Sequence, residues 1–249
     1  MNCAGKVAVV AGGSSGLGAA TVEALTDAGA TVVVLDVSVP EEGAGYEGTH
    51  YRLADVRDSD QVAAAIEYAA SLGDLRIVAS CAGVGSVGKI TRKGQPLDLD
   101  EFQRVIDINL VGTFNVLRHA ATLMVENEPI EDERGVLIVT ASAAAFEGQI
   151  GQVAYAASKG GIVGMTLPIA RDLAASQVRC VAIAPGLFNT PLLGALPEAA
   201  RKALEETIPN PSRLGRPSEF GQLMRQIVEN PMINGETLRI DGALRMAPR

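Results

Sequence analysis

A serine, a tyrosine and a lysine in the second half of the sequence have the types and spacing needed to move a proton. Tyr155 and Lys159 are four residues apart, so on a helix they share one face. A phenol with a reference pKa of about 10 is neutral at pH 7, and a nearby ammonium lowers that pKa. Tyr155 would then accept a proton, while the Ser142 hydroxyl holds the reacting oxygen. Because a packed tyrosine and a solvated lysine also have this spacing, the catalytic interpretation requires a cofactor site nearby.

The composition favours one α/β domain over residues 1–249. Of these residues 47% are hydrophobic and 4% aromatic, and 27 are glycine, which suits helices packed closely on an aliphatic sheet. A formal net charge of −8 argues against binding to nucleic acid or to an anionic membrane, because both need a positive surface.

The cysteines and histidines predict neither a disulfide framework nor a metal site. Cys3, Cys81 and Cys180 are widely spaced without a C-x-x-C pattern, and His50 and His119 are the only histidines. The first strand begins near residue 6, and no apolar run approaches about 18 residues, so we expect neither a leader peptide nor a membrane span. A reducing cytoplasm fits these features.

Apolar runs and helical patterns alternate along the chain. The strands are predicted at 6–11, 31–36, 49–53, 76–80, 135–140, 177–184 and 236–240. The helices are predicted at 19–28, 59–71, 98–126, 155–175, 197–206 and 218–229. This alternation predicts a Rossmann fold, a doubly wound parallel sheet of about seven strands with helices on both faces.

The turn after the first strand has the character of a phosphate site. It carries Gly12, Gly16 and Gly18 and leads directly into a helix. Small residues let the backbone approach a pyrophosphate, and the start of a helix presents free N–H groups. Since glycine also serves tight turns for steric reasons alone, the cluster is a weak signal by itself.

Asp36, at the end of the second strand, strengthens this interpretation. An acidic side chain at that place accepts hydrogen bonds from the adenosine ribose hydroxyls. It would repel a 2′-phosphate, and Val37 and Ser38 supply no compensating charge, so NAD is favoured over NADP. The alternative is a helix cap or a turn residue.

Two further strand ends carry candidate cofactor residues. Asp55 follows the third strand and is expected to bond the adenine amino group with Val56 packed nearby, or to cap the helix at 59–71. Cys81, Ala82 and Gly83 follow the fourth strand and are small enough for a ribose to pass.

The next two segments offer one substrate contact and one catalytic contact. Residues 84–96 carry Lys89, Arg92 and Lys93, which either form an ordinary solvated loop, the interpretation favoured slightly, or contact the phosphates of a handle such as coenzyme A.

Asn109 lies in an apolar helical pattern and needs hydrogen-bond partners. It either stitches a bend in the helix or holds a water leading toward Lys159.

The last third of the chain supplies a second cofactor loop and a lid. Pro185 and Gly186 turn over the end of the sixth strand, where Thr190 is placed to bond a nicotinamide carboxamide. The stretch 186–213 resembles a mobile lid over an apolar substrate. The glycines at 160, 161 and 164 fit either a subunit contact or internal packing.

Taken in order, these motifs resemble the short-chain dehydrogenase/reductase family over essentially the whole chain. The motifs are Gly12-x-x-x-Gly16-x-Gly18, Asp55, Asn109, Ser142, Tyr155-x-x-x-Lys159 and Pro185-Gly186. The stretches 107–116, 144–148, 158–173 and 183–188 are similar to family members that oxidise 3-hydroxyacyl-CoA esters. The wider family usually has Asn-Asn-Ala-Gly where this chain has Ser80-Cys81-Ala82-Gly83.

The resemblance implies a role for each matching residue. The implied catalytic set is Asn109, Ser142, Tyr155 and Lys159, and the implied substrate contacts are Ser142, Gln152 and Tyr155. The NAD contacts from motif and resemblance together are Gly12, Ser15, Gly16, Leu17, Gly18, Asp36, Asp55, Val56, Cys81, Ala82, Gly83, Tyr155, Lys159, Pro185, Gly186, Phe188 and Thr190.

The resemblance also implies a homotetramer and an enzyme of fatty acid metabolism that interconverts a secondary alcohol and a ketone, with 3-hydroxyacyl-CoA esters as the expected substrates. Three alternatives remain at this point. They are a 3-oxoacyl-(acyl-carrier-protein) reductase, which prefers NADPH, a hydroxysteroid dehydrogenase, and a scaffold protein that binds the dinucleotide without turnover.

Overall fold

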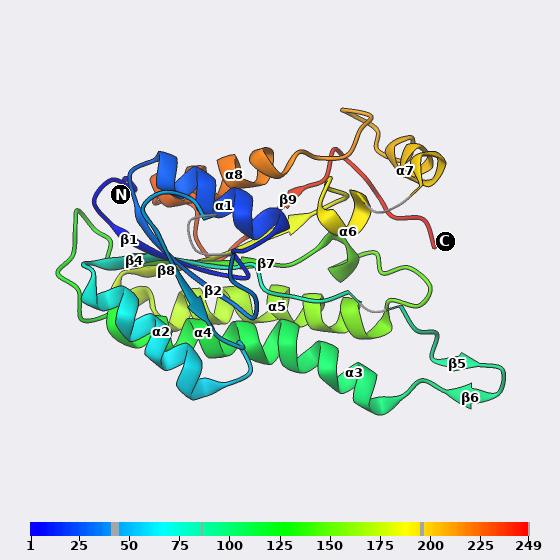
Figure 1. Cartoon of the computed structure of the whole chain (residues 1–249), viewed down its shortest axis with the longest axis horizontal. Helices are drawn as coiled ribbons and strands as arrows, with labels where there is room; N and C mark the ends of the chain where they lie inside the picture. Colours follow the sequence, from blue (N-terminus) through cyan, green and yellow to red (C-terminus); the bar gives the residue numbers. More distant parts are fainter. Residues whose placement is uncertain (41–44, 86, 195–196, 249) are drawn as a thin grey trace.

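Seven parallel strands form one sheet in the computed structural model, which describes residues 1–40, 45–85, 87–194 and 197–248 (Figure 1). Their order across the sheet is β3-β2-β1-β4-β7-β8-β9. The strands are β1 (Val7–Ala11), β2 (Thr31–Asp36), β3 (Thr49–Leu53), β4 (Leu75–Ser80), β7 (Gly135–Thr140), β8 (Val178–Pro185) and β9 (Thr237–Ile240). All seven predicted strands are confirmed, with ends shifted by no more than one residue.

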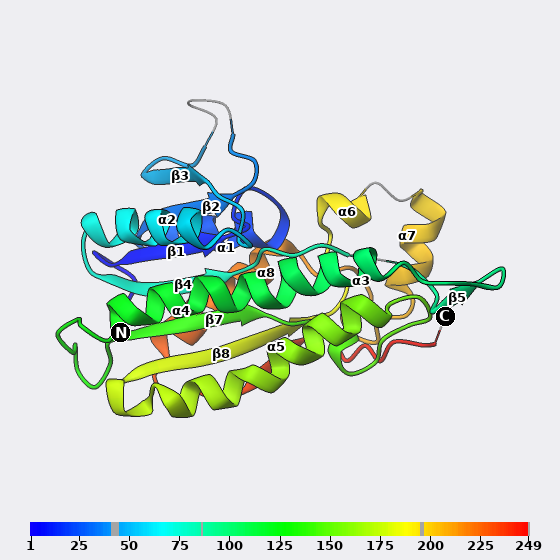
Figure 2. The same cartoon turned by 90° about the horizontal axis from the view of Figure 1, so that it is seen from below.

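Helices cover both faces of the sheet. On one face lie α1 (Gly16–Asp27) and α8 (Pro217–Glu229), and on the other lie α2 (Ser59–Ser71), α4 (Gly112–Met124) and α5 (Val153–Asp172) (Figures 1 and 2). The prediction of a single doubly wound α/β domain is therefore confirmed. Within the described ranges, no helix combines the length and the apolar character that crossing a membrane requires.

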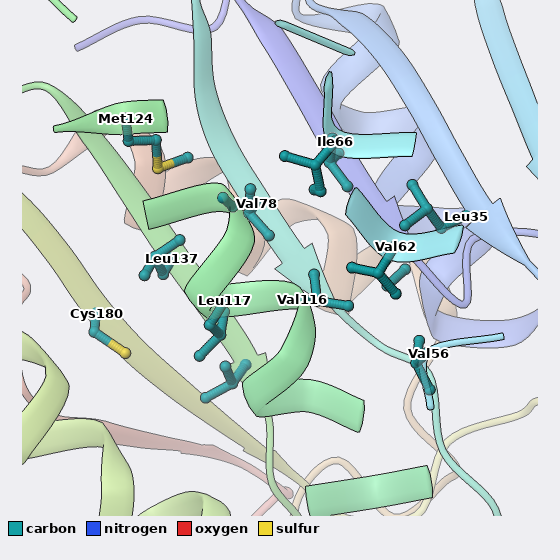
Figure 3. Packing of buried hydrophobic residues seen from close by; sticks show 14 of the residues in the cluster. Leu35, Val56, Val62, Ile66, Val78, Val116, Leu117, Met124, Leu137 and Cys180 are labelled. Atoms are coloured by element: carbon teal, nitrogen blue, oxygen red, sulfur yellow. The ribbon is translucent and has the colours of Figure 1, made fainter. Parts of the chain in front are cut away.

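The strands hold the two helix layers together because their side chains alternate between two buried clusters. Val7 and Val9 of β1 belong to the cluster under α2, α4 and α5, whereas Ala8 and Val10 belong to the cluster under α1 and α8. Figure 3 shows Val116 of α4 among the side chains of the first cluster. A sheet buried on both faces has rigid strand ends, on which a site can be built.

The long helix predicted over 98–126 is wrong in one respect. It consists of α3 (Leu99–Ile106), a π-helical turn (Asp107–Val111) and α4. The Gly112 N–H reaches back five residues to the Asp107 carbonyl, which widens this turn. Asn109 lies inside the turn and is fully buried.

Three short elements were not predicted. A hairpin of β5 (Thr91–Arg92) and β6 (Gln95–Pro96) projects at one end of the molecule (Figure 2). Its two turn residues, Lys93 and Gly94, both have positive φ, as a tight hairpin turn requires. A third short element, α6 (Pro191–Gly194), precedes the predicted helix α7 (Glu198–Glu205).

Candidate active site

The strand order reverses between β1 and β4, and the glycine-rich turn lies at this point. Gly12 has φ +75°, and a Cβ there would lie 2.5 Å from the Ala82 nitrogen. A Cβ on Gly18 would lie 1.9 Å from the Gly12 carbonyl oxygen. Side chains at these positions would push the backbone away from the place where a pyrophosphate is expected.

The start of α1 fits a phosphate ligand. Ser15 is the N-cap residue, yet its side chain makes no capping hydrogen bond. The first N–H groups of the helix therefore lack the usual side-chain acceptor, which is the donor set that an anion uses. Leu17 occupies the first turn of the same helix. The glycine cradle and this helix end together fit the phosphates of a dinucleotide.

Asp36 ends β2 beside the same turn. Its Oδ2 accepts a hydrogen bond from the Ser14 N–H at 3.0 Å, and its Oδ1 accepts one from the Ser38 N–H at 3.2 Å. The carboxylate therefore stabilises the phosphate turn and caps no helix, so the helix-cap alternative is wrong. Asp36 is only half-buried, which leaves the carboxylate accessible to a ribose.

Asp55 follows β3, is partly buried, and pairs with Arg57, whose Nε lies 3.0 Å from Oδ1. This hydrogen bond holds the pKa of Asp55 below its usual value. The alternative role of Asp55 as the cap of α2 is wrong, because the Asp58 side chain accepts the N–H groups of Asp60 and Gln61 at 3.0 Å. Val56 is buried, and its side chain lies against Gly112.

Asn109 ties the loop after β4 to α5. Its Oδ1 accepts the Val84 N–H at 2.8 Å, and its Nδ2 donates to the Val84 carbonyl and to Ser158 Oγ, both at 3.0 Å. A Cβ on Gly83 would lie 3.2 Å from Asn109 Oδ1 and 3.5 Å from Lys159 Nζ. The amide thus has three partners within the protein, and a water path to Lys159 stays a prediction.

Lys159 is buried beside this loop with 4% of its surface exposed. Its Nζ donates to the Thr140 carbonyl oxygen at 2.6 Å and lies 5.8 Å from the centre of the Tyr155 ring. Burial lowers the pKa of Lys159 to about 8. The side chain is therefore mainly protonated at pH 7, close to its titration range.

Tyr155 and Ser142 face each other, but the expected direction of the tyrosine pKa is wrong in this structure. Burial raises the pKa of Tyr155 above its usual value, and a hydrogen bond from Ser142 opposes that rise only in part. The Lys159 ammonium donates to the Thr140 carbonyl and lies 5.8 Å from the centre of the ring. Ser142 Oγ also accepts the Ala144 N–H at 3.1 Å, which fixes its side chain.

The loop after β8 closes the site from the other side. The Thr190 methyl lies 3.7 Å from where a Gly16 Cβ would stand, so Thr190 is close to the start of α1. A Cβ on Gly186 would lie 2.7 Å from Asp241 Cβ. The Phe188 ring is buried against Phe220, with ring centres 6.2 Å apart, and its carbonyl accepts the Thr190 N–H at 2.9 Å.

Three residues of the site were missed from the sequence. Thr140 supplies the carbonyl that binds Lys159, and its Oγ1 lies 3.5 Å from Cys81 Sγ. Ser14 joins the glycine turn to Asp36, and Ser158 holds Asn109. Each is a polar residue adjacent to a motif, and this was the available signal. Thr140 ends a strand, Ser14 lies within the glycine-rich turn, and Ser158 lies between Tyr155 and Lys159.

Comparison with known proteins agrees with this geometry. The model of the short chain dehydrogenase family matches residues 6–201. The chain belongs to this family. It is therefore an oxidoreductase whose cofactor is a nicotinamide dinucleotide.

The relatives of this short-chain dehydrogenase cover its whole length. It is 51% identical to the 3-hydroxyacyl-CoA dehydrogenase type-2 of Homo sapiens, over 98% of this chain and 97% of that protein. It is 32% identical to a 3-oxoacyl-(acyl-carrier-protein) reductase of Thermotoga maritima, over 98% and 99%. The crystal structure of a Mycobacterium avium 3-hydroxyacyl-CoA dehydrogenase type-2 superposes with a TM-score of 0.93 at 41% identity, over 98% of both chains.

The lowered pKa of Lys159 predicts how the stability of the short-chain dehydrogenase depends on pH. Its pKa is about 8 in the folded chain, against 10.5 for an ordinary lysine, so the unfolded chain binds more protons between these values. Stability relative to a Lys159→Met variant should therefore rise by about 2 kcal/mol from pH 7 to about pH 9.5. Urea unfolding of both proteins measures this difference. The exposed Lys202→Met variant is the control, and a flat or falling difference for Lys159 would contradict the assignment.

Proposed function

We propose that this short-chain dehydrogenase is an NAD-dependent enzyme that interconverts 3-hydroxyacyl-CoA and 3-oxoacyl-CoA esters. One observation carries the proposal: Ser142, Tyr155 and Lys159 converge at the strand ends that also hold the glycine cradle. A tyrosine that can act as a proton acceptor near the edge where a dinucleotide fits supports this proposal. The names of the human and mycobacterial relatives support the substrate class.

In the proposed oxidation, Tyr155 removes the hydroxyl proton of the substrate while Ser142 donates a hydrogen bond to the same oxygen. The bound dinucleotide would supply the hydride acceptor. Lys159 favours the phenolate when its ammonium is held near the ring, and the Thr140 carbonyl keeps it at that place. Asn109 is assigned a positioning role, because its amide fixes the backbone at Gly83 and Val84 against α5.

We further assign the dinucleotide to the strand ends in two parts. Its adenosine half would contact Asp36, Asp55 and Val56, and the preference for NAD rests on the Asp36 carboxylate. The pyrophosphate, nicotinamide and adjoining ribose would contact Gly12, Ser15, Gly16, Leu17, Gly18, Cys81, Ala82, Gly83, Tyr155, Lys159, Pro185, Gly186, Phe188 and Thr190.

A cavity of about 550 Å³ at the start of α5 supports a substrate with an extended handle. It is lined by residues 88–91 at the base of the hairpin, by residues 148–153 and by Ala156. Gln152 and Lys89 are among the lining residues, so the cavity offers one polar amide and one cation to a substrate. We assign residues 186–213 as a lid. Its helix α7 contains no buried residue among those described, and residues 195–196 lie outside the described part.

The alternatives can be separated by substrate and cofactor. A 3-oxoacyl-(acyl-carrier-protein) reductase would prefer NADPH and a protein-bound acyl group, a hydroxysteroid dehydrogenase would turn over steroids, and a scaffold would turn over nothing. Absorbance at 340 nm with acetoacetyl-CoA and either NADH or NADPH distinguishes these cases. The higher identity to the dehydrogenases than to the reductase favours the first function.

Replacing Tyr155 by Phe tests the proton transfer. The variant loses only the phenolic oxygen, so turnover should fall by roughly 10²–10⁴-fold while the affinity for the dinucleotide changes little. Stopped-flow turnover and fluorescence titration with NADH measure the two effects. Tyr68→Phe is the control, since its hydroxyl bonds His50 at 2.9 Å on another part of the fold. Turnover of the Tyr155→Phe variant at the normal rate would exclude the mechanism.

Replacing Asp36 by Asn tests the preference for NAD. The amide oxygen can still accept one of the two N–H groups of Ser14 and Ser38, which bond different oxygens of the carboxylate, and the change removes the charge that repels a 2′-phosphate. The ratio of kcat/KM for NAD to that for NADP should fall by about 10–100-fold, as removal of a like-charge contact predicts. Asp27→Asn, on the exposed end of α1, should leave the ratio unchanged. An unchanged ratio for Asp36→Asn would place the preference elsewhere.

Replacing Lys89, Arg92 and Lys93 together by Glu tests whether these side chains contact the phosphates of coenzyme A. All three side chains are exposed on or beside the hairpin, where they either contact phosphates or are simply solvated. If they contact phosphates, KM for acetoacetyl-CoA should rise by about 10-fold or more, because each contact is charge-assisted. A small ketone ester without a phosphate handle serves as the control substrate. Equal changes in KM for both substrates would remove this assignment.

We also propose a homotetramer, with α4 and α5 at one of its contacts. These helices lie in the same layer (Figure 2), and Val111 and Phe114 are each 50% exposed while Leu167 is 42% exposed. A Cβ on Gly164 would meet nothing within 4 Å, whereas one on Gly161 would meet Leu110, so only Gly161 is explained by internal packing. Light scattering should give four times the mass of the chain, and Phe114→Glu should lower it. A monomer would contradict the proposal.

A cytoplasmic location fits the free thiols of Cys3, Cys81 and Cys180.

A further inference from the structure

The loop that joins Ser142 to Tyr155 is held from outside by a carboxylate that the proposed mechanism does not use. Glu147 Oε1 accepts Arg239 Nη1 at 2.7 Å, and its Oε2 accepts Arg239 Nη2 at 3.0 Å and the Met246 N–H at 3.2 Å. Glu147 lies between the two catalytic residues in sequence, whereas Arg239 belongs to the last strand. A parallel pair of hydrogen bonds from a guanidinium to a carboxylate fixes direction as well as distance.

Arg239 connects this loop to a second carboxylate. Its Nε donates to Asp241 Oδ2 at 2.7 Å, and its guanidinium lies 5.3 Å from the centre of the Phe146 ring. Asp241 is 7% exposed, and the Glu147 and Arg239 side chains are 23% and 21% exposed. The cluster is thus partly shielded from water, so its geometry is better defined than that of a surface ion pair.

The second carboxylate, Asp241, lies against the loop after β8, which we assign to the nicotinamide end of the cofactor. A Cβ on Gly186 would stand 2.7 Å from Asp241 Cβ, and the Gly186 N–H donates to the Ile240 carbonyl at 3.0 Å. On the other side, a Cβ on Gly148 would stand 2.8 Å from Ala156 Cβ, so the loop next to Glu147 packs on the start of α5. Ala156 is the neighbour of Tyr155 in the sequence. Arg239 therefore joins the loops that follow β7 and β8, and the more exposed Arg245 pairs with the same two carboxylates, at 3.5 Å from Glu147 Oε1 and 3.2 Å from Asp241 Oδ2.

We infer that Arg239, with Glu147 and Asp241, is a positioning element that sets the Ser142–Tyr155 pair against the nicotinamide end of the cofactor site. This inference rests on the proposed function. The residues touch neither the reacting atoms nor the assigned dinucleotide contacts other than Gly186, so they act through the two loops. A displacement of about 1 Å at a reacting group lowers turnover by about 10²-fold, which is the scale on which such an element matters.

Two variants test the inference without removing a catalytic group. Glu147→Gln keeps the shape of the side chain but loses the charge, and Arg239→Lys keeps the charge but loses the paired hydrogen bonds. Each should lower kcat by about 10–100-fold and leave the dissociation constant for NADH within about 3-fold. The double variant should cost little more than one of the singles, because both break the same link. Glu229→Gln, which breaks the exposed pair with Arg225 on α8, is the matched control and should change none of these values.

A pH profile separates positioning from simple stabilisation. Lys159 from α5 and Ser142 from the loop after β7 face the phenol, and the Ser142 hydrogen bond lowers the pKa of Tyr155. In the Glu147→Gln variant the loop is held less firmly, so the Ser142 hydrogen bond lowers the pKa of Tyr155 less. The acidic limb of the log(kcat/KM) profile should therefore move to higher pH. A role in stability alone would lower the unfolding midpoint and leave that limb in place.

The outcomes separate this inference from the proposed function. A normal kcat and pH profile in a folded Glu147→Gln protein, with turnover that still depends on Tyr155, would overturn the inference alone. A Tyr155→Phe variant that turns over at the normal rate would overturn the proposed function on which it rests. Should Arg239→Lys fail to fold, Glu147→Gln carries the test, since it keeps the side-chain volume.

Discussion

The site depends on a buried ammonium held by a single backbone carbonyl. Lys159 Nζ reaches the Thr140 oxygen at 2.6 Å, and burial reduces its pKa to about 8. A charge in such surroundings is costly unless it has partners, so the chain must hold the lysine there by packing rather than by attraction alone. The rigid end of β7 supplies the carbonyl, and α5 supplies the lysine one turn after Tyr155. The same two elements therefore fix the ammonium and the phenol relative to each other.

The sheet could be predicted because each strand is buried on both faces. A continuous apolar run such as residues 31–36 is compatible with few structures other than a buried strand. The glycine-rich turn and Asp36 could be located because they stand at the ends of such runs. The position of Ser142 follows from the same rule, because parallel strands present their carboxyl ends at one edge, and the helical spacing of Tyr155 and Lys159 puts both on one face of α5. Partners far apart in sequence were harder to find. The contact of Lys159 with Thr140 and the contact of Asn109 with Val84 depend on packing between elements, which no local pattern encodes.

The π-helical turn shows why a pattern with the right period still gave the wrong element. The residues on both sides of Asn109 have helical spacing, so 98–126 was predicted as one helix. One wider turn in the middle changes the direction in which the side chains of α4 face, while the apolar spacing stays nearly intact. Its cause lies outside the helix: the Asn109 amide bonds Val84 and Ser158, and Val56 packs where a Gly112 side chain would stand. The tyrosine pKa was misjudged for a related reason, since the sequence shows the spacing of a charge but not the burial of the ring.

The assigned roles are distributed over two kinds of segment. The residues assigned to the cofactor and to proton transfer lie mainly at the ends of buried strands and on the first turns of α5. The hairpin at 91–96 and helix α7 of the assigned lid lie outside the sheet, and none of their described residues is buried. Such segments can differ in length and charge without disturbing the strand ends, because few core contacts depend on them. A change of substrate is thus compatible with an unchanged reaction, provided that the loop between Ser142 and Tyr155 keeps its place.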